Sequence, residues 1–220
     1  MFLADCGTSW SKLLNLVENK VEILKSNELF ERPNLYLDLA TGHLGKRRSK
    51  RFENELIALA KGALGMVDED SFVIVDVGSR DIKAVEFEGR KSKKIEWNQA
   101  CGASTGFTIE ILGNYFNLDY DTLKASKEKF SVTCGVFGME KIFDSIIASG
   151  DIEGAIARFI NGVAYNVFVF AKKPKRIYFS GGLCKNNCFT TSLASYCDVV
   201  KLGRGVLLEG LKKIWEQESC

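Results

Sequence analysis

The stretch Phe-Val-Ile-Val-Asp-Val-Gly-Ser-Arg-Asp-Ile-Lys at residues 72–83 repeats a pattern from the start of the chain, Met-Phe-Leu-Ala-Asp-Cys-Gly-Thr-Ser-Trp-Ser-Lys at residues 1–12. In both copies an apolar run ends in Asp, and Gly, a hydroxyl residue and Lys follow at the same offsets. Short apolar runs bounded by Gly and polar residues predict buried strands. Each copy continues through a polar turn into a further alternating run, so the sequence predicts strand, tight turn, strand, turn, strand, twice.

The remainder of the chain predicts strands mixed with helices, which is typical of layered α/β proteins. We expect strands at residues 36–39, 176–179 and 198–200, and helices over residues 51–64, 105–116, 139–149, 152–170, 187–196 and 205–218. The basic run at residues 46–51 predicts a solvated loop. Two subdomains are expected: residues 1–70 with the first hairpin, and residues 71–220 with the second.

Composition excludes several classes of protein. The 220 residues are 46% hydrophobic and 26% charged, an ordinary globular mixture, and the net charge of +2 predicts no bulk attraction to nucleic acid or membrane. Asp5 interrupts the apolar start before a signal segment can form, and no apolar run reaches membrane-spanning length. We therefore expect a cytoplasmic protein, in which seven cysteines are metal ligands, reactive thiols or structural thiols rather than a disulfide framework.

The repeated hairpins predict a site for a metal and phosphate. Asp5 and Asp76 end buried strands, where a carboxylate is costly unless it meets a cation or hydrogen-bond donors. Mg²⁺ prefers carboxylate and water oxygens and accompanies phosphates, so both aspartates are candidate magnesium ligands and catalytic residues. Gly7 and Gly78 allow close approach of the backbone to a ligand. Hydroxyls and backbone N–H groups that can cradle phosphate come from Thr8, Ser9 and Ser79.

Further residues are candidates for nucleotide contacts. Ser180-Gly181-Gly182 follows a predicted strand and either packs against the adenosine or α-phosphate or simply forms a strand-to-helix turn. Lys12 and Lys83 either touch phosphate or point to solvent, because they lie on alternating strands. Glu110, near the start of a helix, either meets a ribose or complements the helix dipole.

These residues match a known family. The sequence resembles the activators of 2-hydroxyacyl-CoA dehydratases, which are grouped with the ATPase subunits of benzoyl-CoA reductases, over nearly the whole chain. The matching motifs are Asp5-Cys6-Gly7-Thr8, Ala40-Thr41-Gly42, residues 76–83, residues 98–106, residues 131–137 and Ser180-Gly181-Gly182. The resemblance implies the actin-like ATPase fold shared with sugar kinases and Hsp70, with two ribonuclease H-like subdomains. Thr105 and Arg80 fall on its nucleotide-binding segments.

Two cysteines have a special place in the resemblance. Cys101 and Cys134 precede predicted helices, and a helix N-terminus favours the thiolate that ligates iron. Their spacing alone would favour small buried thiols. The resemblance instead places them on the two ligand positions of a [4Fe–4S] cluster, which a homodimer shares because two chains supply four thiolates. Cys6, Cys184, Cys188, Cys197 and Cys220 are expected to be structural or incidental.

The sequence also departs from the family. The segment between the first hairpin and Ala40-Thr41-Gly42 is shorter, so the first subdomain is expected to be abridged and to lack strands or a helix. Ser79-Arg80 replaces the usual Gly-Gln, which puts a cation in place of a neutral residue and leaves ATP hydrolysis open.

The resemblance implies an ATP-dependent one-electron reductase. A ferredoxin or flavodoxin would reduce the cluster, and the electron would pass to an iron–sulfur acyl-CoA dehydratase or reductase. Two alternatives stay open. One is a small-molecule kinase of the same fold, for which Asp81 is the candidate base. The other is a nucleotide-binding module without catalysis, consistent with Arg80 and the abridged first half.

Overall fold

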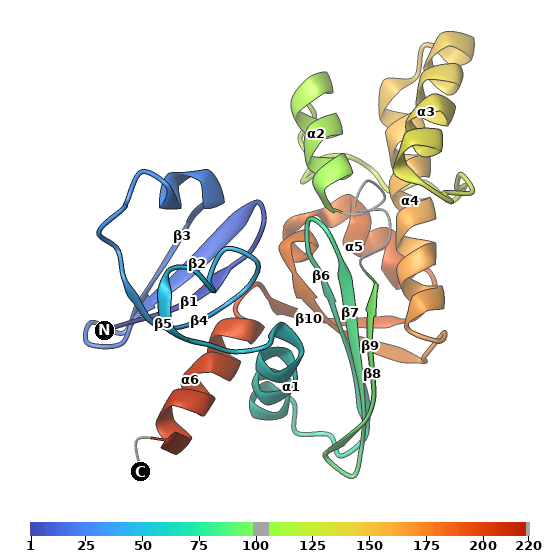
Figure 1. Ribbon diagram of the computed structural model, residues 1–220. Helices are drawn as coiled ribbons and strands as arrows, with labels where there is room; N and C mark the ends of the chain where they lie inside the picture. The colour runs from blue at the N-terminus through green and yellow to red at the C-terminus, as the bar shows by residue number, and fades with distance from the viewer. Residues whose placement is uncertain (99–105, 219–220) are drawn as a thin grey trace. The chain divides into compact units, whose positions relative to one another are not determined.

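The computed structural model describes residues 1–98 and 106–218 (Figure 1), and the chain divides into two compact units. The first unit comprises Met1–Ser71, Val85–Ile95 and Arg204–Cys220, and the second comprises Phe72–Ala84 and Glu96–Gly203. No helix within the described residues is both long and apolar enough to cross a bilayer.

The first unit is built on a five-stranded sheet in the order β3-β2-β1-β4-β5. The first three strands form antiparallel neighbours, whereas β1, β4 and β5 are parallel. This arrangement realises the predicted first copy of the repeat and adds two parallel strands to it. The strands are β1 (Phe2–Cys6), β2 (Trp10–Asn15), β3 (Lys20–Lys25), β4 (Leu37–Thr41) and β5 (Ser49–Phe52).

The segment that we expected to be abridged, between β3 and β4, consists of one 3-10 turn and irregular chain. We expected missing strands or a missing helix, and the sheet has five strands. Between β3 and β4 the only helical element is η1 (Ser26–Leu29), a single 3-10 turn. Leu29 is 1% exposed and packs in a small cluster with Leu13, Leu24 and Leu37, so one turn covers this face of the sheet.

Helices α1 (Glu55–Met66) and α6 (Val206–Glu218) pack side by side, and α6 also lies against β1 and β4 (Figure 1). The two helices approach closely because a glycine of each helix faces the backbone of the other helix. An added Cβ at Gly62 would lie 1.9 Å from the Val206 carbonyl oxygen, and one at Gly210 would lie 1.8 Å from that of Ala58. The C-terminal helix thus belongs with the first unit, whereas we expected residues 71–220 to form one subdomain.

The second sheet has the order β10-β9-β6-β7-β8, in which β9 pairs parallel with both β6 and β10. The strands of each copy can be counted in chain order, with the second sheet taken from its β8 edge. Both sheets then have the order third, second, first, fourth, fifth, so the repeat predicted for the hairpins extends to whole sheets. The strands are β6 (Phe72–Val77), β7 (Ile82–Glu88), β8 (Lys91–Asn98), β9 (Arg176–Gly181) and β10 (Asp198–Gly203).

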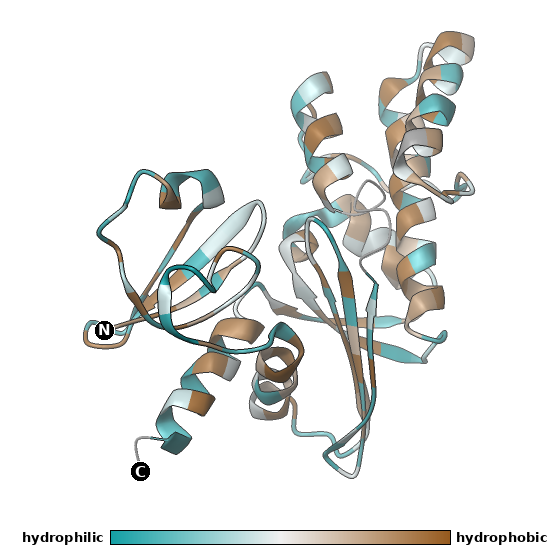
Figure 2. Ribbon diagram, in the orientation of Figure 1, coloured by the Kyte–Doolittle hydropathy of each residue, from teal (hydrophilic) through white to brown (hydrophobic). Residues whose placement is uncertain are grey.

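The helices of the second unit are α2 (Gly106–Phe116), α3 (Gly135–Ser149), α4 (Ile152–Phe170) and α5 (Asn187–Ala194), with the 3-10 turn η3 (Gly182–Lys185) before α5. Hydrophobic residues run along much of α4 (Figure 2), and ten of its residues are buried. Helix α4 packs against α3 and α5 and is the centre of the core of this unit.

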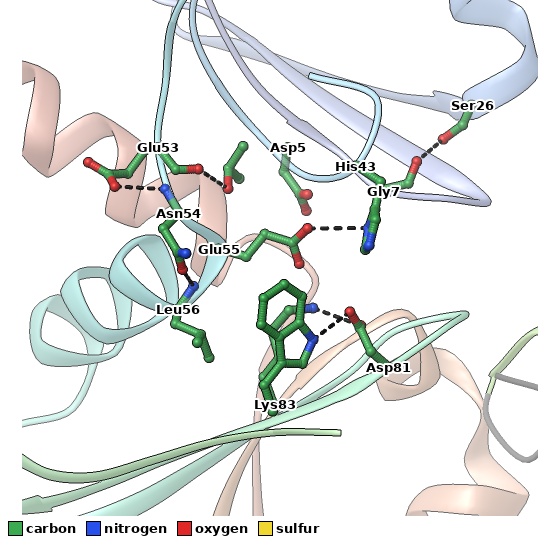
Figure 3. A network of polar contacts seen from close by, with 12 residues as sticks. Asp5, Gly7, Ser26, His43, Glu53, Asn54, Glu55, Leu56, Asp81 and Lys83 are labelled. Carbon is green, nitrogen blue, oxygen red and sulfur yellow. Dashed lines mark hydrogen bonds and ion pairs between the residues drawn. The ribbon is translucent and has the colours of Figure 1, made fainter. Parts of the chain in front are cut away.

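Helix α3 begins at Gly135 and not at residue 139, and α5 ends at Ala194 and not at residue 196. Two further predicted boundaries are wrong for identifiable reasons. Helix α1 begins at Glu55 and not at residue 51, because the Asn54 side chain caps it by accepting the Leu56 N–H at 2.8 Å (Figure 3). The end of the predicted basic loop pairs with β4 as strand β5, where Lys50 lies 2.9 Å from the Asp38 carboxylate.

The close contact of α1 and α6 predicts a cost for enlarging Gly210. In Gly210→Ala the new methyl group overlaps the Ala58 carbonyl, so we expect a loss of about 1–3 kcal/mol of stability despite the better helix propensity of Ala. Urea unfolding followed by circular dichroism measures it. Gly205→Ala is the matched control, since nothing lies within 4 Å of its Cβ; equal unfolding midpoints for the two variants would contradict the packing argument.

Candidate functional site

A buried aspartate ends the central strand of each sheet. Asp5 at the end of β1 is 4% exposed, and its Oδ2 lies 2.5 Å from the Lys12 ammonium on the facing strand. Asp76 holds the same position on β6, is 5% exposed, and accepts a 2.7 Å hydrogen bond from the Ser180 hydroxyl. Each charge is thus held by a protein partner, as a buried carboxylate requires.

A hydroxyl residue followed by glycine lies beside each aspartate. Thr41 pairs in register with Asp5, and Ser180 pairs with Asp76. The glycines that follow, Gly42 and Gly181, have φ angles of 85° and 100°. A Cβ on them would lie 2.3 Å from the Cys6 carbonyl oxygen and 2.4 Å from that of Val77, respectively. Only glycine meets both constraints, the left-handed conformation and the close approach.

This second pair of matched positions extends the repeat beyond what we predicted. We identified Ser180-Gly181 as a candidate element and used Thr41-Gly42 only as part of a resemblance. The signal was present in the sequence as a hydroxyl and a glycine after each of two apolar runs. The intervening lengths differ greatly, so the correspondence becomes visible only when the strands are paired.

The first hairpin turn is tied to the segment after β3. The Ser26 hydroxyl donates to the Gly7 carbonyl at 2.7 Å (Figure 3), and the Ser9 carbonyl accepts the Ser26 N–H at 2.8 Å. Within this turn Thr8 is exposed and Ser9 is half-buried. The predicted phosphate-binding hydroxyls therefore lie on a turn whose backbone is held in place while the Thr8 side chain faces solvent.

The second hairpin turn is hydrogen-bonded to the first turn of helix α2. The carbonyl oxygens of Gly78 and Ser79 accept the N–H groups of Gly106 and Phe107, at 3.2 and 3.0 Å. A Cβ at Gly106 would lie 2.8 Å from the Gly78 oxygen, so the contact requires glycine there. Arg80, at the tip of this turn, is exposed.

Both candidate lysines are buried in ion pairs, so neither points to solvent. Lys12 is paired with Asp5, as described above, and Lys83 is 3% exposed with its ammonium 2.7 Å from Asp81 (Figure 3). The second oxygen of Asp81 accepts the Trp97 indole N–H at 2.8 Å. With both oxygens bonded, Asp81 is suited to anchoring the hairpin.

Sequence reasoning missed Glu55 because it reads as an ordinary acidic residue at a helix start. Its side chain is 9% exposed, and its Oε1 lies 3.4 Å from His43 Nδ1 (Figure 3). His43 follows Gly42 in the loop after β4, so this pair belongs to the same loop edge as Asp5 and Thr41. A buried acid here adds a second carboxylate-bearing position, beside Asp5, to the first unit's candidate site.

The remaining predicted nucleotide residues lie in the second unit. Gly182 opens η3, and a Cβ there would meet nothing within 4 Å, so its backbone is open to a ligand. Glu110 is half-buried on α2. Thr105 and Cys101 lie outside the described residues.

The described cysteines fall into different environments. Cys134 is half-buried at the N-cap of α3, where its carbonyl accepts the Gly138 N–H at 2.9 Å and its side chain makes no cap hydrogen bond. Burial raises the pKa of the Cys6 thiol to about 12 and that of Cys188 to about 11. Cys184 is buried with its sulfur 3.2 Å from the Phe179 carbonyl. The structural or incidental role that we predicted for these cysteines stays a prediction, and their burial fits it.

Comparison with known proteins places the fold among actin-like ATPases and sugar kinases. The activator of the 2-hydroxyisocaproyl-CoA dehydratase from Clostridium difficile, solved with bound ADPNP, superposes with a TM-score of 0.75 at 18% identity, covering 100% of this chain and 98% of that one. Component A of the (R)-2-hydroxyglutaryl-CoA dehydratase from Acidaminococcus fermentans gives a TM-score of 0.72 at 20% identity, over 96% and 93% of the two chains.

The sequence comparison agrees with the structural one. The chain is 23% identical over 213 residues to the (R)-2-hydroxyglutaryl-CoA dehydratase activating ATPase of Acidaminococcus fermentans, covering 83% of this chain and 82% of that protein. No family model matches the chain. In sequence and in fold, the chain is thus similar to the activators of 2-hydroxyacyl-CoA dehydratases, in agreement with the resemblance of its motifs.

The cysteine environments predict a difference in reactivity. With iodoacetamide at pH 8, Cys134 should be modified before Cys6 and Cys188 in the folded protein, and these two should react roughly 100-fold or more slowly because their burial disfavours the thiolate. Peptide mass spectrometry after timed quenching measures each site. Urea-unfolded protein is the control, and the differences should vanish there; equal rates in the folded state would contradict the burial.

Proposed function

We propose that this protein binds Mg²⁺–ATP and hydrolyses it as an activating ATPase. The observation that carries the proposal is the matched pair of buried aspartates, each ending a central strand beside a hydroxyl–glycine pair. The relationship to the activating ATPases supports the same activity. The ADPNP bound to a structural neighbour supports a nucleotide ligand.

Each predicted residue has a role in this proposal. Asp5 and Asp76 orient Mg²⁺, directly or through its water ligands. A protein partner holds Oδ2 of each carboxylate, which fixes the orientation of the side chain. The turns around Gly7 and Gly78 supply backbone N–H groups and hydroxyls to the phosphates. Arg80 offers a cation to the same phosphates, and the backbone of Gly181 and Gly182, which is open at Gly182, faces the adenosine. Thr105 and Glu110 are assigned to the ribose side, and Lys12 acts by holding Asp5.

We also propose that Cys134 and Cys101 ligate a [4Fe–4S] cluster shared by a homodimer. Cys134 fits this role, because its thiol is half-exposed at the N-terminus of a 15-residue helix and is not used in capping. Such a cluster, when bound, supplies one-electron transfer. This chain's residues would hold it at the start of α3 and, through Cys101, just before α2.

The partner in this proposal is an iron–sulfur acyl-CoA dehydratase or reductase, with a ferredoxin or flavodoxin as the electron donor. The basis is the printed role of the relative, which activates a hydroxyacyl-CoA dehydratase. Nucleotide would bind one arrangement of the two subunits better than another, and that difference in affinity would drive the switch.

A kinase of the same fold is the weaker candidate. Phosphoryl transfer to a hydroxyl requires a carboxylate base within reach of the acceptor. Asp81, the candidate base, is 3% exposed and has both oxygens bonded, to Lys83 and Trp97. The nucleotide-binding module without catalysis would bind ATP tightly without turnover and would hold no cluster, so an ATPase assay and an iron count separate it from our proposal.

Removing one carboxylate charge tests the nucleotide site. Asp76→Asn keeps the shape and the Ser180 contact but weakens Mg²⁺ binding, so ATP hydrolysis should fall on the order of 100-fold. Phosphate release at saturating Mg²⁺–ATP measures it. Asp198→Asn, at an exposed edge-strand position, is the control and should hydrolyse ATP like the wild type. A wild-type chain that neither binds nor hydrolyses ATP would sink the proposal.

The cysteine assignment has its own test. Anaerobic reconstitution with iron and sulfide should give a brown dimer with four irons per pair of chains, and Cys134→Ser should lose most of this iron because thiolate is the preferred ligand. Cys197→Ser, also half-buried, is the control and should retain it. A colourless wild-type protein, or one that keeps its cluster in Cys134→Ser, would refute the assignment.

A further inference from the structure

An irregular segment without a strand partner among the described residues leads to Cys134. We call residues 126–133 the strap. It lies along helix α4, and side chains of that helix satisfy its backbone. The Asn161 amide donates to the carbonyl oxygens of Ser126 and Glu128, at 2.9 and 3.0 Å. Asn161 is 1% exposed, so the strap crosses the buried side of α4 at this point.

The contacts continue along the strap with a period of two. The carbonyl of Phe130 lies against Gly162, where an added Cβ would be only 2.3 Å from the oxygen. The Phe130 N–H donates to the Arg158 carbonyl at 3.1 Å. The amide of Asn166 then donates to the Val132 carbonyl at 2.6 Å. Carbonyls 126, 128, 130 and 132 all contact α4, and the next residue in this alternation is Cys134.

Neighbouring side chains hold the Asn161 contact in place. The Tyr196 hydroxyl donates to the Asn161 Oδ1 at 2.8 Å, which leaves the amide nitrogen to face the strap. Tyr196 stacks on Phe168, with ring centroids 5.6 Å apart. From the strap itself, the Lys129 ammonium lies 4.4 Å from the centre of the Tyr165 ring. The strap is therefore fixed by aromatic and polar contacts at its start and by Asn166 at its end.

We propose that helix α4 sets the position of the Cys134 thiol through the strap, with Asn166 and Gly162 as positioning residues. Asn166 of α4 donates to the Val132 carbonyl, and Val132 lies two residues before Cys134 in the chain. From the other side, Lys141 of α3 donates to the Ser131 carbonyl at 2.7 Å, which closes the strap onto the helix that Cys134 caps. The role of this positioning in holding a cluster ligand rests on the proposed function.

The geometry also explains why polar residues occupy these places on α4. An asparagine inside a helix has lower helix propensity than an apolar residue, and burying its amide is costly unless it is bonded. Both amides meet carbonyls that have no ladder partner of their own in the described part of the chain. The cost is offset by backbone groups that would otherwise be left unsatisfied beside the cysteine.

The first test uses iron-free protein. In Asn166→Ala the end of the strap loses its hydrogen bond, so iodoacetamide should modify Cys134 roughly five- to tenfold faster than in the wild type. Hydrogen exchange of the peptide spanning residues 126–134 should also be faster. Asn166→Gln keeps an amide donor and should restore most of the wild-type rate, and Asn114→Ala, an exposed asparagine of α2, is the matched control.

A second variant disturbs the strap at a different contact, that between Gly162 and the Phe130 carbonyl. Gly162→Ala pushes the Phe130 carbonyl away, so it should accelerate Cys134 modification even though it adds a good helix former. Should Asn166→Ala fail to fold, Gly162→Ala and Asn166→Gln still decide the matter. Wild-type modification and exchange rates in a folded Asn166→Ala or Gly162→Ala protein would overturn the proposal.

The reconstituted protein separates this inference from the proposed function. If the cluster assignment holds, Asn166→Ala should lose iron to a chelator such as bathophenanthroline several-fold faster than the wild type, with Asn114→Ala unchanged. A wild type that takes up no iron refutes the cluster, while the modification rates still judge the strap. Chelation at the wild-type rate in a loaded Asn166→Ala protein would refute the positioning role.

Discussion

The structure depends on a charge that must be kept at the end of a buried strand. In each sheet the aspartate ends the central strand, where water is largely excluded and its charge needs a partner. The first copy uses the Lys12 ammonium and the second uses the Ser180 hydroxyl. Around these carboxylates, Gly42 and Gly181 let the neighbouring loop come within contact of the strand end, at positions where a Cβ has no room.

The second unit connects this strand end by short routes to the start of helix α2 and to Cys134 at the start of α3. The hairpin after Asp76 gives two carbonyls to the N-terminus of α2, the helix that follows Cys101 in sequence. Helix α4 holds the strap that leads to Cys134, and β9, the next strand along the chain, carries Ser180 just before its last residue, Gly181. One core thus carries both sets of candidate residues, so a change at the hairpin after Asp76 would have packed elements through which to reach Cys134.

Much of the fold could be predicted because its repeat is local. Four apolar residues before an aspartate, then glycine, hydroxyl and lysine, predicted the hairpins at both copies, and long periodic runs predicted α4 with its observed ends. The interpretation was wrong where distant pairing decided the outcome. Residues 49–52 read as a basic loop but form β5 beside β4, and the C-terminal helix joins the first unit because it packs on α1.

The sequence by itself determined the repeat, the residue types at the strand ends and the family resemblance, since these depend on spacing and chemistry along the chain. Only the tertiary structure decided which groups meet. Strand alternation left Lys12 free to face either phosphate or solvent, and the fold buries it against Asp5. Asp81 was a candidate base until Trp97 and Lys83 were found on its two oxygens. Hydrogen bonds between residues far apart in sequence, such as that of Asn166 to Val132, leave no local pattern from which to predict them.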